Sequence, residues 1–545
     1  MAPFEPDTAR SNLIPIVAYF AQTVSVGLLL FVIVRFIDQA SAALPPSQDT
    51  RHRQSKRTRD IRIFTVLTAL SFLLAAYFVI SRRVFSYLDW ASHHNEDAPN
   101  TLWSGWYGGA RDTEGGGLTS YTDLKLGRWW QDTKYSTNDD QLVLGNSKGL
   151  WWAQQLVPSM IAWSIFVGVE GRRRGMPKHV LCAFVALAQT ISLSAAQSLF
   201  WITLLLTPIH LKSSKRDPQW TPKPMAYLLP IVMSFACNAL MPFAVDYLIF
   251  TQPLRVAYFG MLILMTLIPR IAPNVLGSTH STVHSAHRSS AIIFKSLSVT
   301  SFLLHARQTA TALLDNSPPP TYRKYSYIWN SHPETQHSTL YLARVAFTRV
   351  LGALSDNPAI SAVAWDVLLS ALSLCLWAVV RGIDVGDMLS AIVPFKSAHK
   401  DEKHVSFEGE KPKPNGPVDT VASPTSSKRG RGRPKKDTAT PATSTAASTT
   451  SARELRRSIR HHRTAPSSSA VSALHGVEDS EEDDSGPYVP PADVAAEVEG
   501  LEHEDEGAET VVEEAEAAAL GWGLFALGGL GVLSAGVCGG EVCGR

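Results

Sequence analysis

The sequence predicts an all-α fold: a polytopic transmembrane helix bundle of about seven or eight spans, with a long disordered C-terminal tail. Three features of the chain support this prediction. Residues 1–395 are a series of long apolar runs separated by polar or basic segments. Residues 396–516 hold few large apolar side chains, so they cannot bury enough surface to offset the entropy lost on ordering. Residues 517–545 form a hydrophobic, glycine-rich C-terminal segment.

The composition of the whole chain conceals this organisation because it averages two unlike regions. A net charge of +2 and a hydrophobic content of 45% are ordinary values for a soluble protein. The five cysteines do not form a disulfide framework, since Cys182, Cys237 and Cys375 lie inside predicted spans. We therefore expect no dependence on an oxidising compartment.

Two spans and a basic loop begin the chain. Leu13–Val34 is uncharged and long enough to cross a bilayer, and Ile63–Ile80 is a second run of the same kind. The segment between them is rich in Arg and Lys, and short basic loops stay on the cytoplasmic side of a membrane. We therefore expect this first loop in the cytoplasm. The N-terminus and the Val84–Lys148 loop are then expected on the opposite side.

The most distinctive stretch of the chain is Gly149–Gly175. Trp151 and Trp152 open an apolar run that Arg172–Arg174 close. Indole rings favour the lipid–water boundary, and a block of arginines marks the cytoplasmic end of a span. Helical spacing places several polar or large side chains on one face, which we expect to meet protein rather than lipid. These side chains are Gln155, Ser159, Trp163 and Glu170.

Five further apolar runs complete the predicted spans. They are Val180–Ile209, Met225–Phe250, Val256–Pro269, Ala291–Leu314 and Ala359–Val380. In the first of them, Ser192 and Ser194 suit hydrogen bonds between helices. If that run crosses the membrane, strict alternation places the basic segment Lys212–Lys223 on the non-cytoplasmic side, against the positive-inside rule. Ala291–Leu314 contains charged residues, so it fits either a span or an amphipathic helix in the interface.

Three carboxylates in or near predicted spans are the candidate catalytic residues, Asp366, Glu170 and Asp246. A carboxylate inside a span is costly in lipid, so each is a functional hypothesis and a candidate general acid. Asp366 heads a polar stripe that continues through Ser370, Ser373 and Arg381 at helical spacing. The alternative role for Asp366 is a structural ion pair or hydrogen bond to a neighbouring helix.

The tail is bipolar. Its first half carries clustered Lys and Arg residues up to Arg463, and Glu478–Glu516 is strongly acidic. Such blocks of like charge are typical of interaction tails. Ala517–Gly540 is long enough to span a membrane, although its glycines weaken a helix. This segment is either a C-terminal membrane anchor or a stretch without a role, and the sequence favours neither alternative.

A peptide in the basic half of the tail, residues 429–436, resembles an AT-hook. An AT-hook lies in the minor groove of A·T-rich DNA, where arginines suit the narrow, negative groove and glycine permits a close approach. The resemblance implies nucleic-acid contacts by Arg429, Arg431, Gly432, Arg433 and Pro434. Anionic lipid headgroups, RNA or a transport receptor are alternative partners for the same charges.

The membrane domain resembles uncharacterised multi-pass integral membrane proteins of filamentous fungi. The residues that carry this resemblance are Trp151–Trp152, the Glu170–Arg174 end and the segment Asn357–Asp366. It implies a fold but no activity. In general form the bundle is also similar to fungal membrane-bound terpene cyclases, which implies buried carboxylates that protonate an isoprenoid.

The chain has no Walker loop, Gly-x-Ser-x-Gly, His-Glu-x-x-His or paired Cys-x-x-Cys motif, so we expect neither soluble-enzyme chemistry nor a cofactor or metal. The favoured function is to bind or move a small lipophilic molecule. The alternatives are a membrane-embedded lipid- or isoprenoid-modifying enzyme and a membrane scaffold with an interaction tail. We expect the lipid bilayer as a partner, in the endoplasmic reticulum or the plasma membrane. The tail is expected to bind anionic lipid, nucleic acid or protein.

Overall fold

The computed structural model describes residues 13–44, 51–95, 129, 143–207, 219–244, 248–271, 273–280, 283–319, 321–322, 335–394 and 492–543. The chain divides into two units, and apart from the first five residues of the last helix, 492–496, the described residues belong to the unit made of Met1–Lys400 and Glu497–Arg545. Most of the predicted tail, with the AT-hook-like peptide, lies outside the described residues. Residues 492–516, which the sequence assigns to the tail, are helical.

The described chain is built from helices and two short pairs of antiparallel strands. The helices are α1 (Leu13–Ala42), α2 (Arg51–His93), α5 (Ser147–Arg173), α6 (Lys178–Thr190), α7 (Leu193–Leu206), α8 (Pro224–Ala244), α9 (Leu248–Ile271), α10 (Pro273–Leu276), α11 (Val283–Asp315), α12 (Thr339–Asp356), α13 (Pro358–Arg381), α14 (Val385–Ile392) and α15 (Ala492–Cys543). Strand β1 (Gln219–Pro222) pairs with β2 (Gly277–His280), and Gln219 lies opposite His280. Strand β3 (Thr321–Tyr322) pairs with β4 (Thr335–Gln336).

Seven described helices are long and apolar enough to cross a membrane: α1, α2, α8, α9, α11, α13 and α15. The predicted polytopic helix bundle is therefore confirmed. The run Ala291–Leu314 lies within α11 and belongs to a membrane-length helix. The predicted boundary between Phe250 and Val256 is wrong, because α9 already begins at Leu248. Pro253 lies in the second turn of α9, where its ring removes one backbone hydrogen bond of the helix.

Helix α5 lies at the centre of the bundle, packed against α9, α11 and α13. The face expected to meet protein is buried throughout: Gln155 is 5% exposed, and Ser159, Trp163 and Glu170 are 0% exposed. Helix α5 has 27 residues, enough to cross a bilayer, but it is not apolar enough to belong to the seven helices named above. Its polar side chains are tolerated because other helices enclose it.

The two ends of the bundle differ in charge. We call the end at Arg172–Arg174 the arginine end, where α5 stops. At the opposite end, the far end, the Lys148 ammonium pairs with the Asp356 carboxylate at 3.2 Å. Helices α5 and α13 both run from the far end to the arginine end, and α11 runs back, since its Thr309 accepts a hydrogen bond from the Trp151 indole near the start of α5.

The predicted span Val180–Ile209 is wrong, because this run forms two helices in a hairpin. Helices α6 and α7 have 13 and 14 residues. At about 1.5 Å per residue each is about 20 Å long, too short for a hydrocarbon layer of about 30 Å. Arg174, just before α6, donates a hydrogen bond to the carbonyl oxygen of Leu204 near the end of α7, so the chain enters and leaves at the arginine end. Ser192 accepts the N–H of Ala195 and starts the second helix.

Helix α15 is also a hairpin. Gly529 has a φ of 71° and divides it into a first arm, residues 492–528, and a second arm, residues 530–543. The arms lie side by side, since a Cβ added to Gly536 would stand 3.2 Å from Leu524 Cδ1. The second arm returns to the arginine end, where the Glu541 carboxylate pairs with Arg381 at 3.2 Å. The predicted hydrophobic C-terminal segment is therefore part of the bundle. It forms the end of the first arm and the whole second arm rather than one span.

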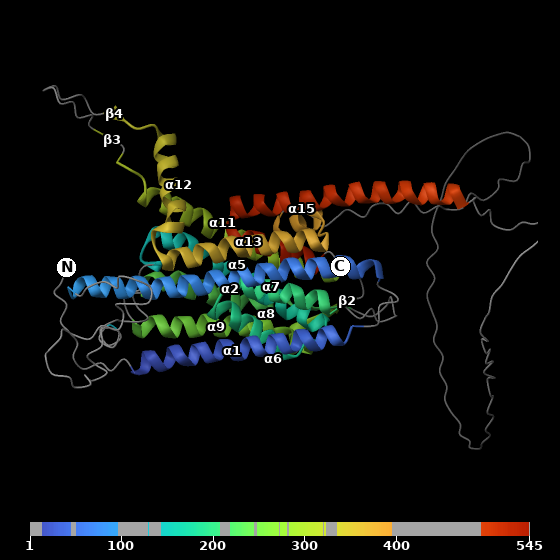
Figure 1. Ribbon diagram of the computed structural model, residues 1–545, viewed down its shortest axis with the longest axis horizontal. Coiled ribbons are helices and arrows are strands. Elements are labelled where there is room, and N and C mark those ends of the chain that lie inside the picture. Colours follow the sequence, from blue (N-terminus) through green and yellow to red (C-terminus); the bar gives the residue numbers. More distant parts are fainter. Residues whose placement is uncertain are drawn as a thin grey trace, which may run out of the picture. The chain divides into compact units, whose positions relative to one another are not determined.

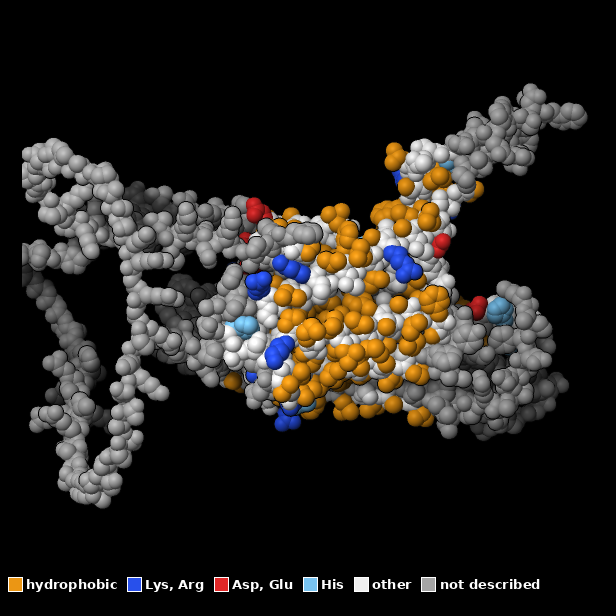
Figure 2. All heavy atoms as spheres, turned by 180° about the vertical axis from the view of Figure 1, so that it is seen from behind, with side chains coloured by type: hydrophobic (Ala, Val, Ile, Leu, Met, Phe, Trp, Pro, Cys, Tyr) orange, Lys and Arg blue, Asp and Glu red, His pale blue; other side chains and the backbone are white. Residues whose placement is uncertain are grey.

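Among the described residues, seven helices thus run from end to end, α1, α2, α5, α8, α9, α11 and α13, and two hairpins enter from the arginine end. Figure 1 shows these long helices side by side, with α12 at one end and the first arm of α15 at the other. The α6–α7 hairpin removes the conflict over Lys212–Lys223, because the chain comes back to the end from which it entered. Figure 2 shows a broad apolar surface with Lys and Arg side chains at its margins, as a bilayer requires.

Candidate functional site

Asp366 lies at the tip of the α6–α7 hairpin. One carboxylate oxygen accepts hydrogen bonds from the Ser192 hydroxyl at 2.6 Å and from the Ser194 N–H at 3.0 Å. The other oxygen accepts the Leu193 N–H at 3.0 Å. A carboxylate from α13 therefore caps the first turn of α7, where N–H groups have no partner inside their own helix and where negative charge is favoured.

A chain of hydroxyl groups extends from this cap into the bundle. The Ser194 hydroxyl lies 2.8 Å from that of Ser192 and donates to the Ser71 hydroxyl of α2 at 3.0 Å. Two turns further along α7, Ser373 of α13 accepts the Trp201 indole N–H at 3.0 Å. The predicted hydrogen bonding by Ser192 and Ser194 between helices is confirmed. The cap and the serines together fix the hairpin to α2 and α13.

Glu170 belongs to a separate cluster at the arginine end. Its fully buried carboxylate pairs with Arg173 at 2.7 Å and with Arg174 at 3.3 Å. Arg173 also donates to the carbonyl oxygen of Val542 at 3.1 Å, which connects α5 to the second arm of α15. Each of these charged groups has a partner of opposite sign or a carbonyl oxygen. The cluster therefore holds the end of α5 against the second arm of α15.

The two candidate carboxylates that the structure describes, Asp366 and Glu170, do not converge. Asp366 and Arg381 are separated by about 22 Å along α13 at 1.5 Å per residue, and Arg381 lies at the level of the Glu170 cluster. Asp246 lies outside the described residues, as do Arg429, Arg431, Gly432, Arg433 and Pro434. Acid–base catalysis by Asp366 and Glu170 in one cavity therefore gains no support from the geometry.

A narrow cavity lies at the turn of the α15 hairpin, between α5 and α11. Its polar walls are the amides of Gln154, Gln155 and Gln308 and the imidazole of His305, and Trp151 forms part of the apolar wall. The space between the walls totals about 270 Å³, while its clear centre is about 10 Å³, enough for one water molecule. The cavity is therefore too narrow in this conformation for anything larger than a water molecule.

Glycine is required at the turn that closes this cavity. Gly529 has a φ of 71°, which glycine adopts without strain. A Cβ at this position would also stand 2.7 Å from the Nδ1 atom of His305. The Gln155 side-chain oxygen accepts the N–H of Leu530 at 3.3 Å, which partners the first N–H of the second arm.

Sequence patterns do not single out most of this cavity. Gln155 was expected on a protein-facing face of α5, which is confirmed. His305 interrupts an apolar run without any neighbouring motif. The available signal was the Gly528–Gly529 pair in the middle of an apolar segment, which marks a break in a helix.

Comparison with known proteins identifies no relative: no protein-family model, curated protein or solved structure matches the chain. The resemblances to fungal membrane proteins, terpene cyclases and AT-hooks therefore remain predictions from the sequence. Function is inferred from the geometry alone.

Proposed function

We propose that this chain is a multi-pass integral membrane protein that binds and moves a small lipophilic molecule, with the cavity at the α15 turn as the binding site. The observation that supports this proposal is a glycine turn inside the bundle that borders a polar cavity. Backbone that leaves regular helix at membrane depth is tolerated only where protein buries it or where it lines a cavity. Membrane transporters place their substrate sites at such interrupted helices.

The walls of the cavity define the chemistry of the ligand. Trp151, Pro158 and Leu304 provide apolar surface for a hydrocarbon body. The amides of Gln154, Gln155 and Gln308 and the imidazole of His305 both donate and accept hydrogen bonds, which suits one hydroxyl, carbonyl or carboxyl group. The clear centre of the cavity holds only one water molecule, so a lipophilic ligand enters only if the turn opens. The glycines at 528, 529 and 531 give the backbone the conformational freedom to open.

The arginine end is assigned to the cytoplasm in this proposal. The first basic loop, Arg172–Arg174 and the segment Lys212–Lys223 then all follow the positive-inside rule. The N-terminus and the Val84–Lys148 loop face the opposite side, and the endoplasmic reticulum or the plasma membrane is the expected location.

The test is mass spectrometry of lipophilic molecules that co-purify with the full-length protein in a mild detergent. Gln308→Trp should fill the cavity and deplete the ligand, because Gln308 lines it. Thr311→Trp is the matched control, since Thr311 lies on the same helix but is exposed and outside the cavity. A set of bound molecules that is identical in the wild type and Gln308→Trp would contradict the proposal.

A further inference from the structure

Helix α12 differs from the crossing helices in direction and in surface. It lies across them and extends sideways from the bundle at the far end (Figure 1). Its last residue, Asp356, pairs with Lys148, and α13 begins its membrane crossing at Pro358. An amphipathic helix that runs sideways at the level where a span begins lies in the lipid–water interface.

The exposed surface of α12 carries both apolar and cationic side chains. Leu340 and Phe347 are 81% and 47% exposed, and their spacing of seven residues places them on the same side of the helix. The bundle contacts another side through the buried Ala346 and Val350. Leu340 and Phe347 therefore form an apolar side that is free to contact acyl chains.

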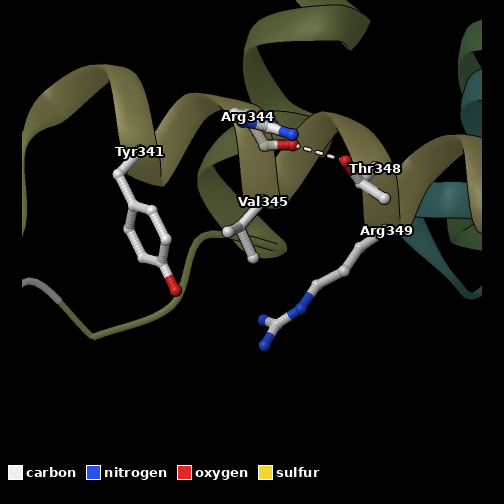
Figure 3. Close-up of a pocket in the computed structure, with 5 residues that line it drawn as sticks. All are labelled: Tyr341, Arg344, Val345, Thr348 and Arg349. Carbon is white, nitrogen blue, oxygen red and sulfur yellow. Dashed lines mark hydrogen bonds between the residues drawn. The ribbon is translucent and has the colours of Figure 1, made fainter.

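Beside Leu340 and Phe347 the exposed surface carries a hollow of about 270 Å³ lined by Tyr341, Arg344, Val345, Thr348 and Arg349. Figure 3 shows Tyr341, Val345 and Arg349 extending from the same side of the helix, with the Thr348 hydroxyl hydrogen-bonded to the Arg344 carbonyl oxygen at 2.8 Å. None of the five lining residues is acidic. Two guanidinium groups without a carboxylate among these residues match the charge of a phosphate group, and guanidinium is a preferred partner of phosphate oxygens.

We propose that this hollow binds the phosphate of a membrane phospholipid in the leaflet at the far end. Arg344 and Arg349 hold the phosphate oxygens, and the Tyr341 ring lies at the level of the headgroups, where tyrosine is enriched. The acyl chains pass along the side of Leu340 and Phe347. The site is independent of the cavity at the α15 turn, because α12 contributes no residue to that cavity.

The test is native mass spectrometry of the full-length protein in detergent with dioleoyl phosphatidic acid as the probe. Arg344→Gln is the principal variant, since Arg344 makes no side-chain hydrogen bond with the described residues, whereas Arg349 also donates to the Asn316 carbonyl oxygen at 3.1 Å. We expect about fivefold weaker binding of the first lipid by Arg344→Gln, from the loss of one cation. Arg307→Gln, an exposed arginine of α11 outside the hollow, should bind like the wild type.

Further measurements identify the chemical group that the hollow binds. Dioleoylglycerol has the same chains without phosphate and should bind the site far more weakly. Inorganic phosphate at millimolar concentration should fail to displace the lipid. Thr348→Trp fills the hollow and keeps both arginines, so it should also weaken lipid binding. It replaces Arg344→Gln as the test variant if Arg344→Gln does not fold. Unchanged affinity in these variants, equal binding of dioleoylglycerol or displacement by inorganic phosphate would each overturn the proposal.

Discussion

Replacing Asp366 tests whether its carboxylate holds the α6–α7 hairpin in place. The carboxylate accepts three hydrogen bonds, from the Ser192 hydroxyl and from the N–H groups of Leu193 and Ser194. Asp366→Asn keeps one acceptor oxygen but presents an NH₂ group to one of the donors. A hydrogen bond to a charged group contributes about 1.5–3 kcal/mol in soluble proteins, and one between membrane helices averages about 0.6 kcal/mol.

We therefore expect Asp366→Asn to lower the free energy of unfolding by about 2 kcal/mol, and Asp366→Leu, which removes every acceptor, by about 4 kcal/mol. A loss of 2 kcal/mol corresponds to a fall of about 5 °C in the unfolding midpoint. The reason is the same in both variants: buried N–H groups at the start of α7 lose their partner.

The measurement is the fraction of detergent-extracted protein that stays monodisperse in size-exclusion chromatography after heating. Asp356→Asn is the matched control, because the Asp356 side chain is 52% exposed and its pair with Lys148 contributes less than about 1 kcal/mol. The expected order of stability is Asp356→Asn, then Asp366→Asn, then Asp366→Leu. If all three variants are equally stable, the carboxylate does not cap the helix and this account of the hairpin is wrong.

Three other predictions follow from the topology and the contacts. Glycosylation acceptors engineered into Val84–Lys148 should be modified, and those in Arg51–Arg62 and Lys212–Lys223 should not; modification in the last segment would contradict the α6–α7 hairpin. Deletion of residues 397–490 should leave the unfolding midpoint unchanged, because these residues lie almost wholly in the second unit, and a large fall would show that they pack on the bundle. Glu541→Gln leaves Arg381 without its buried partner and should cost about 3 kcal/mol, and combining it with Arg381→Gln should recover part of this loss in the same heating assay. Simple addition of the two losses would show that the pair is not coupled.

The crossing helices were predictable from the sequence because each is a long apolar run. The position of Asp366 on a polar stripe of α13 also predicted contacts with a neighbouring helix. The burial of Gln155, Ser159 and Glu170 on one face followed from helical spacing alone. In these cases the local pattern and the packing agree.

The hairpins were not predictable from hydrophobicity, since a helix that turns back inside protein is as apolar as one that crosses. The run Val180–Ile209 holds no charge, and only its length beyond a single span and the capping residue Ser192 indicate a break. The cavity was hidden for a different reason. Gln155, His305 and Gly529 come from three distant parts of the chain, and none belongs to a motif.

The second arm of α15 is the last element of the described chain, yet it contacts helices made much earlier. Helix α15 begins about a hundred residues after α14, and the cost of closing such a loop rises by only about 0.6 kcal/mol for each doubling of its length. Arg173 and Arg381 are made long before their partners at 541 and 542 arrive. All seven crossing helices are therefore synthesised before the second arm, whose last residues supply the contacts that complete the arginine end.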